Sequence, residues 1–156
     1  MAAFRILSVN VSAQKGTEKA PVAGAVADPD GLAGDAHRGV PGRGVSLLDI
    51  ESIEAFARDS GIGVGPGSFG ENLTTVGIDL AEVGPGDRIT AGGALLEVTA
   101  IGKTCHGDGC AIFRKVGRCV MPSRGVFCRV IRGGAIAPGS EGRHHRSGEQ
   151  AKPSDP

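Results

Sequence analysis

Residues 83–101 read VGPGDRITAGGALLEVTAI, and this stretch decides the class of fold. Two short runs rich in apolar and β-branched residues, Asp87–Thr90 and Leu95–Ile101, are separated by glycines, and a Gly-Pro-Gly sequence precedes the first. Such runs are typical of strands joined by tight turns. Similar runs recur at 4–11, 21–26, 72–76 and 125–131. Several short strands at this spacing predict a barrel or a rolled sheet with little helix.

One helix is predicted, over residues 47–60. Ser46 and Asp49 have the spacing of a capping box, apolar residues recur at helical intervals, and Gly61 can supply a left-handed cap. From Gly61 to Gly70 five glycines and a proline predict a loop.

The chain has 156 residues, of which 40% are hydrophobic and 27 are glycine, as expected for one folded domain with many turns. We place this domain at residues 1–139. Residues 140–156 are almost entirely polar, which predicts a mobile C-terminal tail. No apolar run approaches the length of a membrane span, and the first eleven residues alternate instead of forming a signal peptide, so we expect a cytoplasmic protein without membrane contact.

The charges balance overall but divide along the chain. Residues 1–100 contain 7 basic and 13 acidic side chains, whereas residues 101–156 contain 10 and 4. The basic segment 103–132 should attract an anion. Because the chain has no Trp or Tyr, stacking platforms for bases are scarce, and we expect a small anionic ligand and no nucleic acid.

The most informative residues for chemistry lie in GKTCHGDGC, residues 102–110. Cys105 stands between Lys103 and His106, and nearby cations favour the thiolate. Cys105 is therefore a candidate nucleophile, sulfur carrier or soft-metal ligand, although an inert loop cysteine also fits. With Cys110 and Cys119, Cys105 and His106 would offer four zinc or iron–sulfur ligands, but their spacing is poor for such a site.

Two further loops hold candidate residues. In GLAGDAHRG, residues 31–39, Asp35 can orient His37, and Arg38 or Arg43 can hold an anion, although solvated charges in a turn fit equally well. Glu71 and Asn72 precede a predicted strand, where loops often bind ligands, but capping of backbone amides would also explain Glu71.

Cys128 alternates with Val126 and Val130 on an apolar strand face, which is typical of a buried, inert cysteine.

Five segments occur together in this order: GLAGDAH (31–37), VSLLDIESIE (45–54), FGENLTTVGIDL (69–80), VGPGDRI (83–89) and IGKTCH (101–106). Together they resemble the MOSC domain, the module at the C-terminus of molybdenum cofactor sulfurases that also occurs as a stand-alone bacterial protein. The resemblance covers roughly residues 3–139. It implies a mostly β fold, a strongly curved barrel-like sheet with few short helices.

The resemblance also implies that Cys105 is the functional thiol, acting as a persulfide carrier or as a ligand to the metal of a molybdenum pterin cofactor. The pyridoxal-phosphate domain of the full sulfurases is absent from this sequence, so we expect no bound pyridoxal phosphate and a separate sulfur donor such as a cysteine desulfurase. Cys110 and Cys119 depart from the family pattern; they would resolve a persulfide on Cys105 or help to bind a metal.

We therefore predict a sulfur carrier that passes sulfane sulfur from Cys105 to an anionic acceptor such as molybdopterin, with a molybdoenzyme as a further partner. Lys103 and His106 would favour the thiolate, and His37 and Glu71 would orient the acceptor or move protons. The remaining acceptor-binding candidates are Arg43, Asn72 and Arg124. The alternatives are a molybdenum or tungsten cofactor protein or oxidoreductase with Cys105 as metal ligand, and a non-catalytic module stabilised by zinc.

Overall fold

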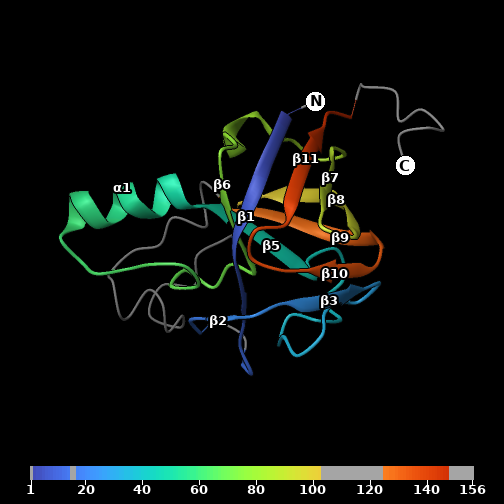
Figure 1. The fold of residues 1–156 in the computed structure, drawn as a ribbon, viewed down its shortest axis with the longest axis horizontal. Helices are drawn as coiled ribbons and strands as arrows, with labels where there is room; N and C mark the ends of the chain where they lie inside the picture. Colours follow the sequence, from blue (N-terminus) through green and yellow to red (C-terminus); the bar gives the residue numbers. More distant parts are fainter. Residues whose placement is uncertain (1, 15–16, 103–124, 148–156) are drawn as a thin grey trace.

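The computed structural model describes residues 2–14, 17–102 and 125–147 (Figure 1). Its elements in chain order are β1 (Ala2–Val11), β2 (Ala20–Val22), β3 (Ala25–Asp28), β4 (Gly31–Leu32), β5 (Val45–Asp49), α1 (Ile50–Ser60), β6 (Leu73–Val76), the 3₁₀ turn η1 (Leu80–Glu82), β7 (Arg88–Ala91), β8 (Ala94–Ile101), β9 (Val126–Arg132), β10 (Gly134–Ile136) and β11 (Glu141–His145).

Seven of the described strands form a closed barrel in the order β11-β7-β8-β9-β5-β6-β1, which pairing of β1 with β11 completes. The neighbours pair antiparallel except β5 and β6, which are parallel. Strands β10, β3 and β4 form a small second sheet. The prediction of a mostly β, barrel-like fold is confirmed, and the predicted strands at 72–76, 87–90, 95–101 and 125–131 match β6, β7, β8 and β9 to within one residue.

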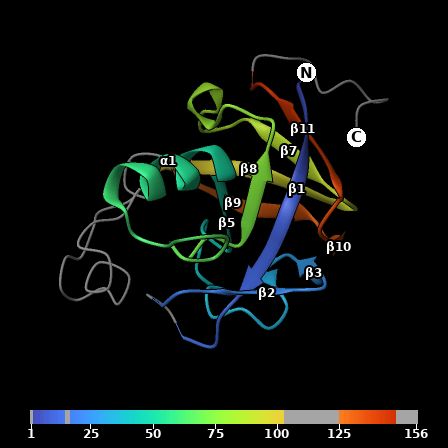
Figure 2. The ribbon, with the colours of Figure 1, turned by 60° about the vertical axis from the view of Figure 1, so that its left-hand side comes forward.

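Two apolar clusters hold these elements together. The larger fills the barrel with alternate residues of its strands, including Leu47, Leu73 and Leu96, which are fully buried. The smaller joins α1 to the outside of the barrel through Leu48, Ile53, Phe56, Phe69 and Phe127. Figure 2 shows α1 lying beside the barrel wall.

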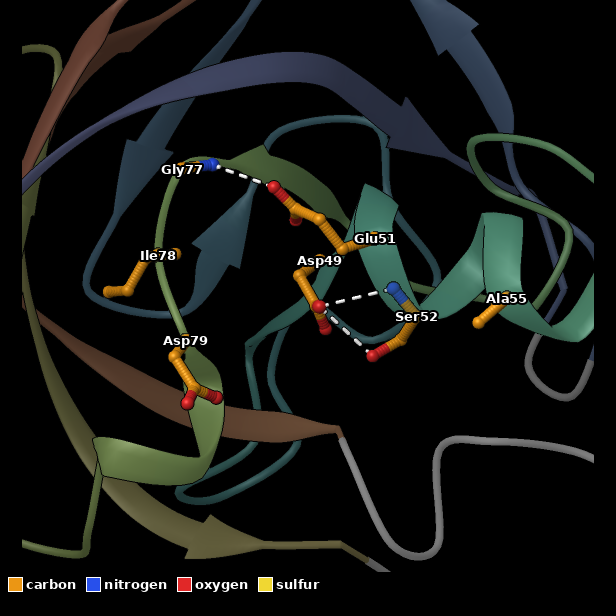
Figure 3. A pocket seen from close by; sticks show the side chains of 7 residues that line it. All are labelled: Asp49, Glu51, Ser52, Ala55, Gly77, Ile78 and Asp79. Carbon is orange, nitrogen blue, oxygen red and sulfur yellow. Dashed lines mark hydrogen bonds between the residues drawn. The ribbon is translucent and has the colours of Figure 1, made fainter.

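The start of the helix differs from the prediction. Residues 45–49 are a strand, so α1 begins at Ile50, and Asp49 rather than Ser46 is its N-cap (Figure 3). Val45 and Leu47 face the barrel interior, whereas Ser46 and Leu48 face outward and are covered as well, Leu48 by the smaller apolar cluster. The run Val45–Leu48 is therefore buried on both sides. A continuous apolar run fits such a strand as well as a helix. The predicted cap Gly61 does adopt the left-handed conformation, with φ of 72°.

The predicted mobile tail is wrong for its first part. Residues 141–145 form β11, which pairs with β1 on one side and β7 on the other and so closes the barrel. The polar side chain of His144 is buried there, with Nε2 2.7 Å from Asp87 Oδ2. Residues 148–156 lie outside the described part of the chain.

Strands β8 and β9 are joined at their ends by a 2.7 Å hydrogen bond from the Gly102 N–H to the Gly125 carbonyl. These two glycines are the described positions that flank residues 103–124. Within the described residues, no helix is long and apolar enough to cross a membrane.

Candidate functional site

The structure describes four of the predicted site residues, His37, Arg43, Glu71 and Asn72. The other six, Lys103, Cys105, His106, Cys110, Cys119 and Arg124, lie outside the described residues. The site is therefore built from the loops around the first four.

A buried ion pair lies at the centre of these loops. Lys19 Nζ is 2.7 Å from Asp35 Oδ1, and the two side chains are 1% and 0% exposed. The backbone N–H groups of Ser12 and His37 also donate to the Asp35 carboxylate. Burial alone would raise the pKa of Asp35, but hydrogen bonds from Lys19 and Asn72, the Lys19 charge and the Ser12 amide outweigh it, so the pKa lies below its ordinary value of 3.8.

Lys19 also connects the pair to His37. Its Nζ lies 3.2 Å from His37 Nδ1, and 3.1 Å from the hydroxyl of Ser12. The expectation that Asp35 orients His37 applies to the His37 backbone, whose N–H donates to Asp35 Oδ2 at 3.1 Å. The contact of the imidazole in this group is with Lys19.

Asn72 ties this pair to the barrel wall. Its carboxamide oxygen accepts hydrogen bonds from the Ser46 N–H and hydroxyl, and its amide group donates to the Asn10 carbonyl at 3.2 Å. Asn72 is 1% exposed, and its side chain contributes to the lowered pKa of Asp35. Asn72 is therefore an internal brace that links β5, the end of β1 and the Asp35 loop.

Glu71 is buried completely beside Asn72. Its Oε2 accepts hydrogen bonds from the Gly67 N–H at 2.8 Å and the Thr74 hydroxyl at 2.7 Å. Burial raises the pKa of Glu71 above its ordinary value of 4.5, in spite of these bonds. The contact with Gly67 is the backbone capping that the sequence offered as one explanation, and Oε1 has no partner among the described residues.

Arg43 lies in the same loop as Asp35 and His37, between β4 and β5. Its guanidinium carbon is 4.7 Å from the centroid of the Phe127 ring, in cation–π geometry. No carboxylate of a described residue pairs with Arg43, whereas Arg38 is bound to Asp28 by two hydrogen bonds of 3.0 and 2.8 Å. Of the two arginines that the sequence offered for anion binding, Arg43 is the one without an acidic partner in the described region.

The comparisons with known proteins agree with this architecture. The family model of the MOSC domain matches residues 34–142, more than two thirds of the chain. The chain belongs to the MOSC domain family. A search of curated proteins found no match.

The fold of this chain is similar to that of several solved structures. The YuaD protein of Bacillus subtilis is 22% identical with a TM-score of 0.77, covering 92% of this chain and 96% of that protein. YiiM of Geobacillus stearothermophilus is 24% identical with a TM-score of 0.72, covering 95% and 78%. YiiM of Escherichia coli is 22% identical with a TM-score of 0.65, covering 91% and 69%. At these identities the likeness concerns the fold.

In this MOSC domain, sequence reasoning missed Lys19. It stands in a polar loop directly before β2, and its partner Asp35 is sixteen residues away, so no local pattern marks it. The prediction for Cys128 is confirmed, because the thiol is fully buried and burial, with a smaller effect of the Glu97 charge, raises its pKa. Within the described residues no group of three acidic, histidine or cysteine side chains is arranged to hold a metal ion.

Proposed function

We propose that this MOSC domain is a sulfur-carrier module in which Cys105 holds a persulfide and passes its outer sulfur to a small anionic acceptor. The observation that supports this most is the position of Arg43. A half-buried guanidinium with no acidic partner among the described residues is suited to a carboxylate or phosphate group, which it can bind through two parallel hydrogen bonds.

Arg43 stands close to the place where the chain leads toward Cys105. Phe127, under the guanidinium, pairs with Ala100 across β8 and β9, and both lie two residues from the hydrogen-bonded pair Gly102 and Gly125. Cys105 follows Gly102 by three residues, so covalent geometry keeps its Cα within about 11 Å of the Cα of Gly102. This limit is compatible with transfer from Cys105 to an acceptor held near Arg43, and it supports the proposal in that sense.

The chemistry has two steps. The Cys105 thiolate attacks the outer sulfur of a donor persulfide; the new bond forms as the donor S–S bond breaks, and the donor leaves as a thiolate. A nucleophilic atom of the acceptor then attacks the outer sulfur of the Cys105 persulfide, and Cys105 leaves as a thiolate. No net oxidant is needed, because sulfane sulfur is transferred in both steps. A molybdenum pterin with its phosphate belongs to this class of acceptor.

His37 and Lys19 are suited to proton handling in this scheme. An ammonium group only donates, so Nδ1 of His37 accepts from Lys19 and Nε2 carries the proton of the neutral ring. The ion pair with Asp35 fixes the position of Lys19 Nζ beside the imidazole. We assign His37 to the protonation of the acceptor or the donor thiolate.

The carrier role is tested by incubating the protein with a cysteine desulfurase and cysteine, followed by intact-mass measurement. We expect a reductant-labile increase of about 32 Da per persulfide. Cys105→Ser should abolish it, whereas the matched thiol deletion Cys128→Ala should retain it. No adduct on the wild-type protein, or an adduct on Cys105→Ser, would refute the carrier role.

The anion-binding role is tested with Arg43→Gln. Transfer from the loaded protein to a phosphate-bearing acceptor should require a higher acceptor concentration, while loading of Cys105 should be unchanged. Arg43→Lys, which keeps the charge but loses the planar fork, should be intermediate. Metal analysis after anaerobic purification separates this proposal from the alternative in which Cys105 is a ligand to molybdenum or tungsten, since a persulfide carrier requires neither metal.

A further inference from the structure

Strand β8 has a bulge at Thr99, which is half-buried. Its neighbours Val98 and Ala100 pair with consecutive residues of β9, so Thr99 has no pairing partner on that strand. The extra residue of a bulge bends the strand and changes the direction of the side chains around it. A threonine at this position can therefore direct its hydroxyl toward a segment outside the sheet.

The Thr99 hydroxyl contacts the loop between β4 and β5. It donates a hydrogen bond to the Gly42 carbonyl of that loop, and the carbonyl of Phe127 on β9 lies 3.1 Å from the same hydroxyl oxygen. A hydroxyl has one proton, which it can share between two such acceptors. Gly42 directly precedes Arg43, and the Arg43 guanidinium carbon is 4.7 Å from the centroid of the Phe127 ring. One side chain thus contacts the backbone of the ring residue and that of the residue before the arginine.

The loop has little buried surface where Arg43 stands. Residues 37–43 are exposed or half-buried, and a hydrogen bond from the Arg43 N–H to the Val40 carbonyl closes a turn within the loop without fixing it to the barrel. After Arg43 the chain is fixed by Val45, the first residue of β5, which pairs with β9. The hydrogen bond from Thr99 supplies the corresponding link to the barrel before Arg43.

We propose that Thr99 is a positioning residue for Arg43. Its hydroxyl keeps Gly42 against the barrel wall and so keeps the guanidinium over the Phe127 ring. A side chain that is already held in place loses less freedom when a ligand binds, so the affinity of Arg43 for an anion is higher than that of a freely moving arginine. This inference rests on the proposed function, in which Arg43 binds the anionic acceptor, and it adds a residue that does not itself contact the acceptor.

The first experiment measures the position of Arg43 without any sulfur transfer. The ring current of Phe127 displaces the NMR signals of the Arg43 side-chain protons from their values in unstructured peptides, and the Arg43 signals are identified by their loss in Arg43→Lys. Thr99→Val replaces the hydroxyl with a methyl group of similar size, and we expect it to move the Arg43 signals toward the unstructured values. Thr99→Ser, which keeps the hydroxyl, should retain the wild-type signals.

Two further variants separate the hydroxyl from packing. Thr99→Ala, compared with Thr99→Ser, repeats the test without the added methyl group of valine, and it should also displace the Arg43 signals. Thr90→Val, at a half-buried threonine of β7, is the matched control and should leave these signals unchanged.

The second experiment measures transfer with sulfite as the probe acceptor. The sulfur atom of sulfite attacks the outer sulfur of the Cys105 persulfide, thiosulfate forms as the S–S bond breaks, and Cys105 leaves as a thiolate. Thr99→Val should raise the KM for sulfite about three- to tenfold, the effect of one lost hydrogen bond, while the loading of Cys105 and the maximal rate stay unchanged. Thr99→Ser should have a KM close to that of the wild type. A merely structural role would lower the amount of folded protein and the maximal rate and leave the KM unchanged.

The two experiments distinguish failure of this inference from failure of the proposed function. Unchanged Arg43 signals in Thr99→Val, or equal displacement in Thr99→Ser, would overturn the role of Thr99 whatever the protein transfers. Displaced signals in Thr99→Val, together with a KM for sulfite that Arg43→Gln does not raise, would support the positioning of Arg43 by Thr99 and would refute Arg43 as the acceptor-binding residue.

Discussion

Removing the ammonium of Lys19 should leave a buried carboxylate without its counter-charge. Lys19→Met keeps the aliphatic stem but deletes Nζ, which is 2.7 Å from Asp35 Oδ1 in a pair whose side chains are 1% and 0% exposed. Breaking such a pair typically costs about 3–5 kcal/mol. Asp35 keeps hydrogen bonds from the Ser12 and His37 amides, so we expect the lower end of this range, about 3 kcal/mol. For a chain of this length that corresponds to a fall in Tm of about 6–12 °C.

The assay is urea unfolding at pH 7 for Lys19→Met, Asp35→Asn and the double variant. Because each single change strands the other partner, the double variant should be clearly more stable than the sum of the single losses predicts. The pKa of Asp35 is lowered in the folded protein, so its contribution is present above pH 3.8 and is lost as the pH falls through the lower folded value. The difference between wild type and Lys19→Met should shrink in acid. A loss below about 1 kcal/mol, or strict additivity, would refute the reasoning.

Three further results are expected. The pKa of Glu71 is raised in the folded protein, so the folded protein keeps this proton at pH values above 4.5, where the unfolded chain loses it. The stability of the wild-type protein relative to Glu71→Gln should therefore fall as the pH rises, by up to about 1.4 kcal/mol per pH unit. Parallel pH profiles of the two proteins in urea unfolding would contradict this. Gly67→Ala would place a Cβ in collision with the Lys19 carbonyl and should prevent stable folding, whereas Gly61→Ala, with open space at a similar positive φ, should cost only about 1–2 kcal/mol by thermal unfolding. Truncation after Gly139 removes β11 and should abolish the cooperative thermal transition, while truncation after Ser147 should preserve it; a cooperative transition in the shorter protein would contradict the role of β11.

The sequence predicted the parts of the fold that local patterns determine. Strands β6 to β9 were recognisable because apolar runs are bounded by glycine and proline, and the end of α1 was recognisable at Gly61. The start of α1 was misplaced because Val45–Leu48 is buried on both faces, which erases the alternation of a strand. Strand β11 was missed because EGRHH has no apolar side chain. Its position depends on backbone pairing with β1 and β7, which are distant in sequence.

For the site, too, local patterns predicted some residues, whereas contacts between distant parts of the chain could not be predicted. Polar residues in glycine-framed loops pointed to His37, Arg43, Glu71 and Asn72, since loops of this kind often position functional groups. Their actual partners lie far away along the chain: Lys19 for Asp35, Ser46 for Asn72, and Phe127 for Arg43. Such pairings depend on barrel closure and leave no local trace. The roles of Cys105 and its neighbours remain predictions, because those residues lie outside the described part of the chain.

The hydrogen bond between Gly102 and Gly125 has a consequence for how this protein can diversify. The pairing of β8 with β9 extends to these two positions, so the register of the two strands is fixed by pairs within the described residues. The entropy of closing a connection grows only slowly with its length. The closure entropy of the connection between Gly102 and Gly125 should therefore be nearly the same for shorter and longer connections, so the described barrel itself sets no strict length for the part of the chain between them.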